Sequence, residues 1–211
     1  MVEVKNIEVY GLTRAVNAIS NSFNVGEINT LKEPSDNIKK IAEKLGSNMV
    51  AHQSHDAWLK GILVSFDMKG NGVFMPEFQR YHFAELIMSQ STMHSMEKFM
   101  NSDYDPFTKY VSQATREETI KNYKNWVAKK AEGNKDEIYK AFEILVHNLP
   151  RGFELWVTVS ANYLALKTIV IQRFHHKNRE DWQNFVKACY SMPEFRKLCG
   201  FDNPEWNLEN W

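Results

Sequence analysis

The chain has 211 residues, 43% of them hydrophobic, which is enough apolar material to bury a sizeable core. Its 26 Lys and Arg residues equal its 26 Asp and Glu residues, so the formal net charge is zero. This balance excludes the broad basic surface by which proteins hold nucleic acid through counterion release. We therefore expect a single domain over residues 1–211 that binds no nucleic acid, with any anionic ligand held by a local cluster of side chains.

Targeting and cysteine signals are weak. No stretch approaches 18 uninterrupted apolar residues, and Met1–Lys5 lacks the basic start and apolar run of a signal peptide. We expect a cytoplasmic protein that does not enter a membrane. The two cysteines, Cys189 and Cys199, have no His or Cys motif beside them. We interpret them as buried or incidental thiols, with neither a disulfide framework nor a metal site.

The first predicted elements are a strand and a helix. Apolar residues over 2–9 are spaced loosely as in a strand. Gly11 then breaks the pattern, and apolar residues recur at helical spacing over 12–19.

A second helix and a second strand follow. Ser35 or Asp36 is suited to cap a helix with apolar positions over 38–45, and Gly46 lies where a left-handed residue often ends a helix. Over residues 62–68, apolar Ile62, Val64, Phe66 and Met68 alternate with Leu63, Ser65 and Asp67, which predicts a strand with one well-buried face.

The middle of the chain reads as helical. Residues 77–100 contain no Pro or Gly and predict a long helix, with a possible break around Ser89–Thr92. Residues 101–113 read as a loop. Thr115–Glu118 fits a capping box, which would open the next helix at Thr115.

The C-terminal part predicts three more helices. Apolar residues recur at helical spacing over 138–145 and 182–189, and 155–174 is apolar enough for a largely buried helix. From Pro193 onward we expect an irregular tail. The elements together predict a helix-rich α+β domain.

Polar residues that suit an anion lie in a first patch. Ser89–Thr92 offers hydroxyl and backbone N–H groups that can cradle a phosphate if the helix is interrupted there. Arg80 can add a permanently charged clamp on the same anion. The alternative is that Arg80, His82 and Glu85 form a solvated or salt-bridged helix face, and that His55 is a structural histidine.

A second patch contains Asn162 and, eleven residues later, Arg173 (173 − 162 = 11). An arginine at the end of an apolar helix is costly to bury without partners. We therefore predict that Arg173 meets an anion or several acceptors. His175 and His176 follow it, and exposed histidines at a helix end are the simpler interpretation for that pair.

Over residues 50–190 the two patches resemble flavin-dependent thymidylate synthases. Arg80 matches the first arginine of that family's signature R-H-R-x-x-S-x-N-x-x-S-x-R, and Gln90–Thr92 resembles the Gln-Ser-Thr of many members. Asn162 and Arg173 match an N-x-R and a distal arginine. The chain departs from the pattern where the family has His and Arg (Tyr81, His82) and at two further arginines (Met93, Leu164).

This resemblance implies a small, mostly antiparallel sheet in a helix-rich domain, and a homotetramer whose sites form between subunits. It implies reductive methylation of dUMP at C5, with FAD relaying a methylene from methylenetetrahydrofolate and NADPH as reductant. The matching positions would be Arg80, Gln90, Ser91 and Thr92 for the phosphate, Arg173 for the pyrimidine and its catalysis, and His55, Tyr81, His82 and Asn162 for the flavin.

Three alternatives stay open on sequence alone. One is another C5 modification of a pyrimidine nucleotide, such as hydroxymethylation. A second is a non-catalytic relative that kept the fold and lost flavin, which Leu164 and Met93 favour. The third is an α-helical interaction protein whose similarity is due to chance.

Overall fold

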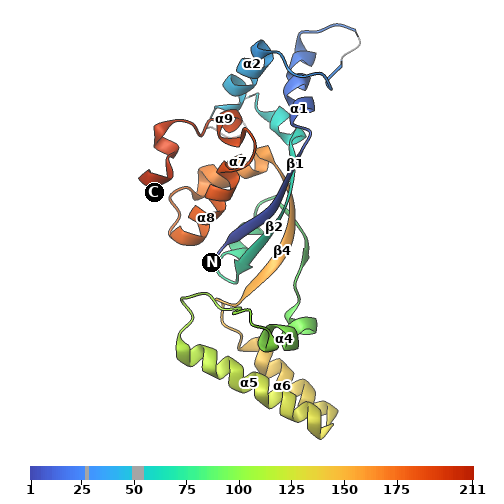
Figure 1. Ribbon diagram of the computed structural model, residues 1–211, viewed down its shortest axis with the longest axis vertical. Coiled ribbons are helices and arrows are strands. Elements are labelled where there is room, and N and C mark those ends of the chain that lie inside the picture. The colour runs from blue at the N-terminus through green and yellow to red at the C-terminus, as the bar shows by residue number, and fades with distance from the viewer. Residues whose placement is uncertain (27–28, 49–54) are drawn as a thin grey trace.

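The computed structural model describes residues 1–26, 29–48 and 55–211. Its centre is a four-stranded antiparallel sheet with the order β1-β2-β4-β3 (Figure 1). The strands are β1 (Glu3–Tyr10), β2 (Leu63–Asn71), β3 (Glu85–Ser89) and β4 (Glu154–Asn162). This confirms the predicted helix-rich α+β fold with a small antiparallel sheet.

Helices cover one face of the sheet and extend from its ends. They are α1 (Leu12–Ala18), α2 (Asp36–Gly46), α3 (Met75–Phe78), α4 (Thr92–Asn101), α5 (Gln113–Glu132), α6 (Lys135–His147), α7 (Tyr163–Arg173), α8 (Arg179–Tyr190) and α9 (Phe195–Cys199). Short 3-10 turns lie at η1 (Ile19–Ser22), η2 (Ala57–Gly61), η3 (Pro204–Trp206) and η4 (Leu208–Asn210). In the part of the chain that is described, no helix combines the length and the apolar character needed to span a membrane.

The core lies between the sheet and helices α7 and α8. On β2 the buried residues Val64, Phe66 and Met68 alternate with more exposed ones, as the sequence predicts. Val157 and Val159 of β4 face the same core. Because successive strand residues point to opposite faces, the other face of the sheet carries polar residues such as Asp67 and Thr158. Helices leave this face uncovered in Figure 1.

Two long stretches that the sequence predicted as helical are partly strands. Residues 85–89 of the predicted helix 77–100 form β3, and helix begins again only at α4, after the expected break. Residues 154–162 form β4, one of the two inner strands of the sheet, and helix α7 follows at once. A short apolar run buried on one face fits either element, and pairing with β2 and β3 decides it here.

Two helix ends also differ from expectation. Gly46 is the last helical residue of α2 and is not left-handed. A Cβ on it would lie 1.9 Å from the carbonyl oxygen of Leu198, so glycine is required for close packing. Helix α5 is capped by Ser112, whose side chain accepts from the backbone N–H of Thr115. The cap therefore lies three residues before Thr115, the residue that the sequence predicted for that position.

The stretch after Pro193, predicted to be irregular, contains α9, η3 and η4. It packs against the core through the fully buried rings of Phe195 and Phe201. Cys189 and Cys199 are buried free thiols, as predicted. Burial raises the pKa of both thiols, so neither is suited to act as a nucleophile.

Candidate functional site

A cavity of about 450 Å³ lies along one face of α7. We call it the α7 cavity. Its walls are η2, the loop after α3 and the α7 helix from its cap to its last residue. Five of the residues predicted for the site line it: Arg80, Tyr81, His82, Asn162 and Arg173.

Helix geometry explains how Asn162 and Arg173 share one cavity. Asn162 ends β4 and caps α7, because its Oδ1 accepts from the backbone N–H of Ala165 at 2.9 Å. Leu164, Thr168 and Gln172 follow at intervals of four and line the cavity. Eleven residues of helix span about 16 Å, so the cavity is long enough for an extended ligand.

The loop after α3 contributes four consecutive residues, Arg80 to Phe83. Phe83 has a φ of 67°, in the left-handed region, and its side chain is 68% exposed. That conformation costs a non-glycine residue about 1–2 kcal/mol. Strain of this kind is concentrated at ligand sites, where the fold holds residues in place for binding.

Arg173 is half-buried and held by aromatic residues. Its Nε donates to the Tyr81 Oη at 2.6 Å. The guanidinium carbon lies 5.4 Å from the centre of the Tyr81 ring and 4.9 Å from that of Trp182. Trp182 is fully buried and donates from Nε1 to Glu77 at 2.8 Å. Burial raises the pKa of Tyr81, and Arg173 opposes that shift.

Positive charge gathers in the α7 cavity. Lys60, Arg80 and Arg173 line it, and none of the three forms an ion pair with a residue that the structure describes. No Asp or Glu is among its described lining residues. In a chain of zero net charge, this creates the local positive potential that an anionic ligand needs. Lys60 carried no motif signal in the sequence and was missed.

The predicted phosphate residues Gln90, Ser91 and Thr92 lie elsewhere. Gln90 pairs with Trp156 of β4, donating from its backbone N–H at 2.9 Å and accepting at its side-chain oxygen at 3.0 Å. Six strand residues, about 20 Å, separate Trp156 from Asn162 at the α7 cavity. Ser91 caps α4, accepting from the backbone N–H of His94. Within one chain the predicted site is therefore split.

His55 is exposed and does not line the α7 cavity. The next residue, Asp56, forms a buried ion pair with Lys167 of α7 at 2.9 Å. The Lys167 Nζ also donates to the carbonyl oxygens of Gly46 at 2.8 Å and Asn48 at 2.7 Å. This contact fixes the start of η2, and with it Lys60, against α7. Sequence reasoning missed it, because Lys167 lies in an apolar pattern without a partner nearby in the sequence.

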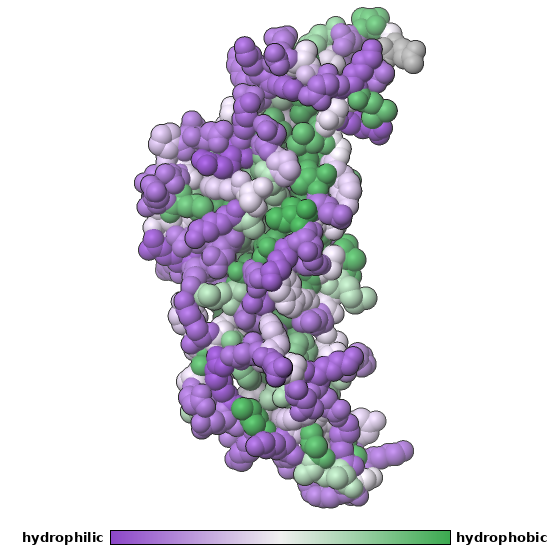
Figure 2. All heavy atoms as spheres, in the orientation of Figure 1, coloured by the Kyte–Doolittle hydropathy of each residue, from purple (hydrophilic) through white to green (hydrophobic). Residues whose placement is uncertain are grey.

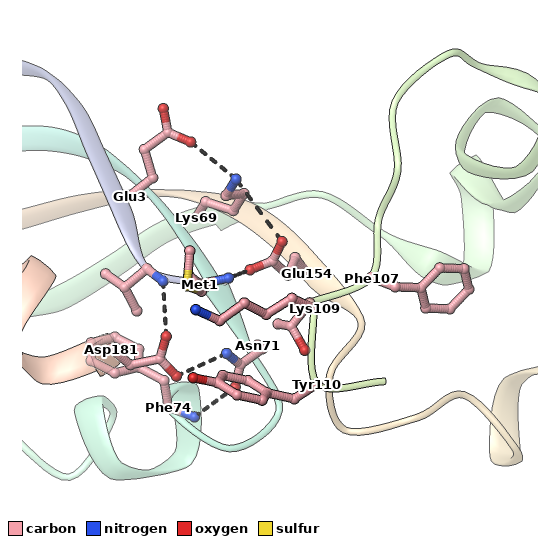
Figure 3. Close-up of polar contacts among 12 residues, drawn as sticks. Met1, Glu3, Lys69, Asn71, Phe74, Phe107, Lys109, Tyr110, Glu154 and Asp181 are labelled. Carbon is pink, nitrogen blue, oxygen red and sulfur yellow. Dashed lines mark hydrogen bonds and ion pairs between the residues drawn. The ribbon is translucent and has the colours of Figure 1, made fainter. Parts of the chain in front are cut away.

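A larger cavity of about 910 Å³ lies near the start of α8 and contains none of the predicted site residues. Its lining carries both signs of charge, with Glu180 and Asp181 beside Lys177 and Arg179, and Figure 3 shows the hydrogen bonds that Asp181 accepts. Asp181 accepts from the backbone N–H of Val2 at 2.9 Å and from Asn71 at 3.0 Å. Lys109 pairs with Glu180 at 2.7 Å. The α7 cavity, whose described lining has cations and no carboxylate, is the better candidate for an anionic ligand.

Two solved structures of thymidylate synthase X (ThyX) from Helicobacter pylori, both described as containing FAD and dUMP, superpose on this chain with TM-scores of 0.67 and 0.66. The alignments cover 96% and 95% of this chain and 98% of each of theirs. The chain has their fold. Sequence identity is 15% in both cases, and the sequence matches no family model and no curated protein. The similarity therefore lies in the fold.

Proposed function

We propose that the chain is a divergent flavin-dependent thymidylate synthase, which methylates dUMP reductively at C5 using methylenetetrahydrofolate, FAD and NADPH. The observation that carries this proposal is the α7 cavity, whose lining includes three cations without an ion-pair partner among the described residues, half-buried Arg173 being one of them. The shared fold with a thymidylate synthase described as containing FAD and dUMP gives the cavity a chemical context.

Arg173 is suited to hold the pyrimidine. Only its Nε–H has an acceptor among the described residues, so the four N–H groups on its two Nη atoms are available to a ligand. A half-buried guanidinium with unused donors favours a ligand that brings carbonyl or anionic oxygens. Beside a pyrimidine ring it would stabilise the negative charge that develops during reaction at C5. The buried thiols of Cys189 and Cys199 take no part.

The residues around the cavity fit a flavin nucleotide. Arg80 and Lys60 are cations for its phosphates, and the rings of Tyr81 and Phe83 offer a surface for a planar group. The side-chain oxygen Oδ1 of Asn162 caps α7, which leaves the N–H groups of its side-chain amide for a ligand. His82 completes this flavin set. When bound, FAD would supply the carrier for the one-carbon unit and the redox chemistry.

The split between Arg173 and Gln90–Thr92 supports a site shared between subunits. A nucleotide cannot contact both patches of one chain across about 20 Å of strand. We therefore propose a homotetramer in which a second copy brings Gln90, Ser91 and Thr92 to the phosphate. Ile87 and Met88 of the edge strand β3 are 59% and 74% exposed, and Figure 2 shows apolar side chains gathering over the middle of the molecule. Apolar surface of this kind is typical of interfaces.

Flavin and nucleotide binding test the proposal. The protein is incubated with FAD, with and without dUMP, desalted, and examined for the visible absorption bands of flavin. We expect retained flavin and saturable dUMP binding by calorimetry. Arg173→Ala should abolish dUMP binding, whereas the matched control Arg14→Ala, on the exposed surface of α1, should not change it.

The same experiment separates the alternatives. A hydroxymethylating enzyme would bind both ligands, and mass spectrometry of the product would then show a hydroxymethyl group in place of a methyl group. A non-catalytic relative would bind dUMP without retaining flavin. One observation favours the non-catalytic relative. Leu164 lines the α7 cavity with an apolar side chain at a position where the resembled family has an arginine. A protein that binds neither ligand would overturn the proposed function.

A further inference from the structure

Arg173 lies in a corner formed by two aromatic rings. The ring centres of Tyr81 and Trp182 are 6.5 Å apart and the rings meet nearly edge to face, at 76°. The guanidinium carbon of Arg173 lies 5.4 Å from the centre of the Tyr81 ring and 4.9 Å from that of the Trp182 ring. These three distances form a compact triangle, so the rings adjoin each other beside the guanidinium and do not enclose it between them.

The hydrogen bond to Tyr81 sets the direction of the guanidinium within that corner. The Tyr81 Oη accepts from Nε at 2.6 Å, which fixes the inner edge of the planar fork. The outer edge, with its two Nη atoms, is left without an acceptor among the described residues, and Arg173 lines the α7 cavity. Trp182 cannot move aside easily, because it is fully buried and bonded to Glu77.

The Tyr81 hydroxyl has a second function available to it. Its oxygen accepts from Arg173, but its own O–H has no acceptor among the residues that the structure describes. Tyr81 also lines the α7 cavity. A ligand bound by the Nη edge of Arg173 would therefore meet a further donor from the phenol.

We propose that Tyr81 is a positioning residue, which orients Arg173 toward the α7 cavity and donates its hydroxyl proton to the same ligand. The identity of that ligand, a uracil nucleotide, rests on the proposed function. The orientation of Arg173 does not. Together the two residues form one recognition unit of donors, which suits a planar base that presents carbonyl oxygens at its edge.

A double-mutant cycle on dUMP binding tests this coupling. Tyr81→Phe keeps the ring against Trp182 and removes only the hydroxyl. We expect it to weaken dUMP binding about tenfold, as for loss of a hydrogen bond to a charged group. In an Arg173→Lys background, which lacks the Nε–H donor, the same change should cost only about twofold to threefold, because only the phenol's own hydrogen bond to the ligand is then lost. Tyr139→Phe, on the exposed surface of α6, is the matched control.

Equal losses in both backgrounds, or no loss from Tyr81→Phe, would overturn the proposal. A second readout works without any ligand. NMR of protein with isotope-labelled arginine should show the Arg173 Nε–H signal protected from solvent exchange in the wild type and lost in Tyr81→Phe, with an unchanged melting temperature. An unprotected signal in the wild type contradicts the positioning role, whereas protection without dUMP binding refutes only the proposed function.

Discussion

The buried contact of Lys167 gives the sharpest prediction about stability. Its Nζ is fully buried, and it bonds Asp56 and two backbone carbonyl oxygens. In Lys167→Met the carboxylate of Asp56, itself 3% exposed, would stay buried without its cation. Loss of one partner from a buried pair costs about 3–5 kcal/mol in the free energy of unfolding. For a chain of this size, that lowers the melting temperature by roughly 6–20 °C.

Thermal and urea unfolding, followed by circular dichroism, measure this loss. The control is Lys39→Met, which removes an exposed ion pair with Glu33 and should cost less than about 1 kcal/mol. The double variant Lys167→Met with Asp56→Leu should recover part of the loss, because it removes the unpaired charge as well. If Lys167→Met and Lys39→Met were equally stable, the buried pair would not hold the start of η2 against α7.

Three further predictions follow from single residues. Lys60→Met should weaken dUMP or FAD binding and reduce its dependence on salt, measured by titration at two ionic strengths, because it removes one of the cavity's cations. Gly46→Ala should cost about 1–3 kcal/mol through its clash with the carbonyl oxygen of Leu198, more than Lys44→Ala on the exposed surface of the same helix; urea unfolding compares them. Burial raises the pKa of the Cys189 thiol above its ordinary value of 9.0, so the unfolded state loses that proton first and stability falls as pH rises past 9.0. Cys189→Ala should flatten that fall in unfolding titrations between about pH 8 and about pH 10.

The fold was predictable where local signals agree with tertiary packing. Ser35 and Asn134 cap α2 and α6 through their own side chains, and both helices follow from sequence alone. Strand β4 was not predictable in the same way. Its apolar residues fit a buried helix equally well, and its strand conformation depends on pairing with β2 and β3 from distant parts of the chain.

The candidate site shows the same division. Asn162 and Arg173 lie at the two ends of α7, and both line the α7 cavity. Their joint place in one site was predicted, because their separation in the sequence matches that of the corresponding residues in the resembled family. Lys60 and Lys167 were not found, because their importance depends on contacts across the fold that no local pattern records. Gln90 was expected beside Arg80 but lies along β4.

We propose above that the α7 cavity holds a uracil nucleotide for flavin-dependent chemistry at C5. The most direct measurement is tritium release from dUMP labelled at C5, in the presence of FAD, NADPH and methylenetetrahydrofolate. We expect tritium release by the wild type and by Arg14→Ala, and none by Arg173→Ala. Absence of release by a folded wild-type protein that retains neither flavin nor dUMP would contradict this proposal.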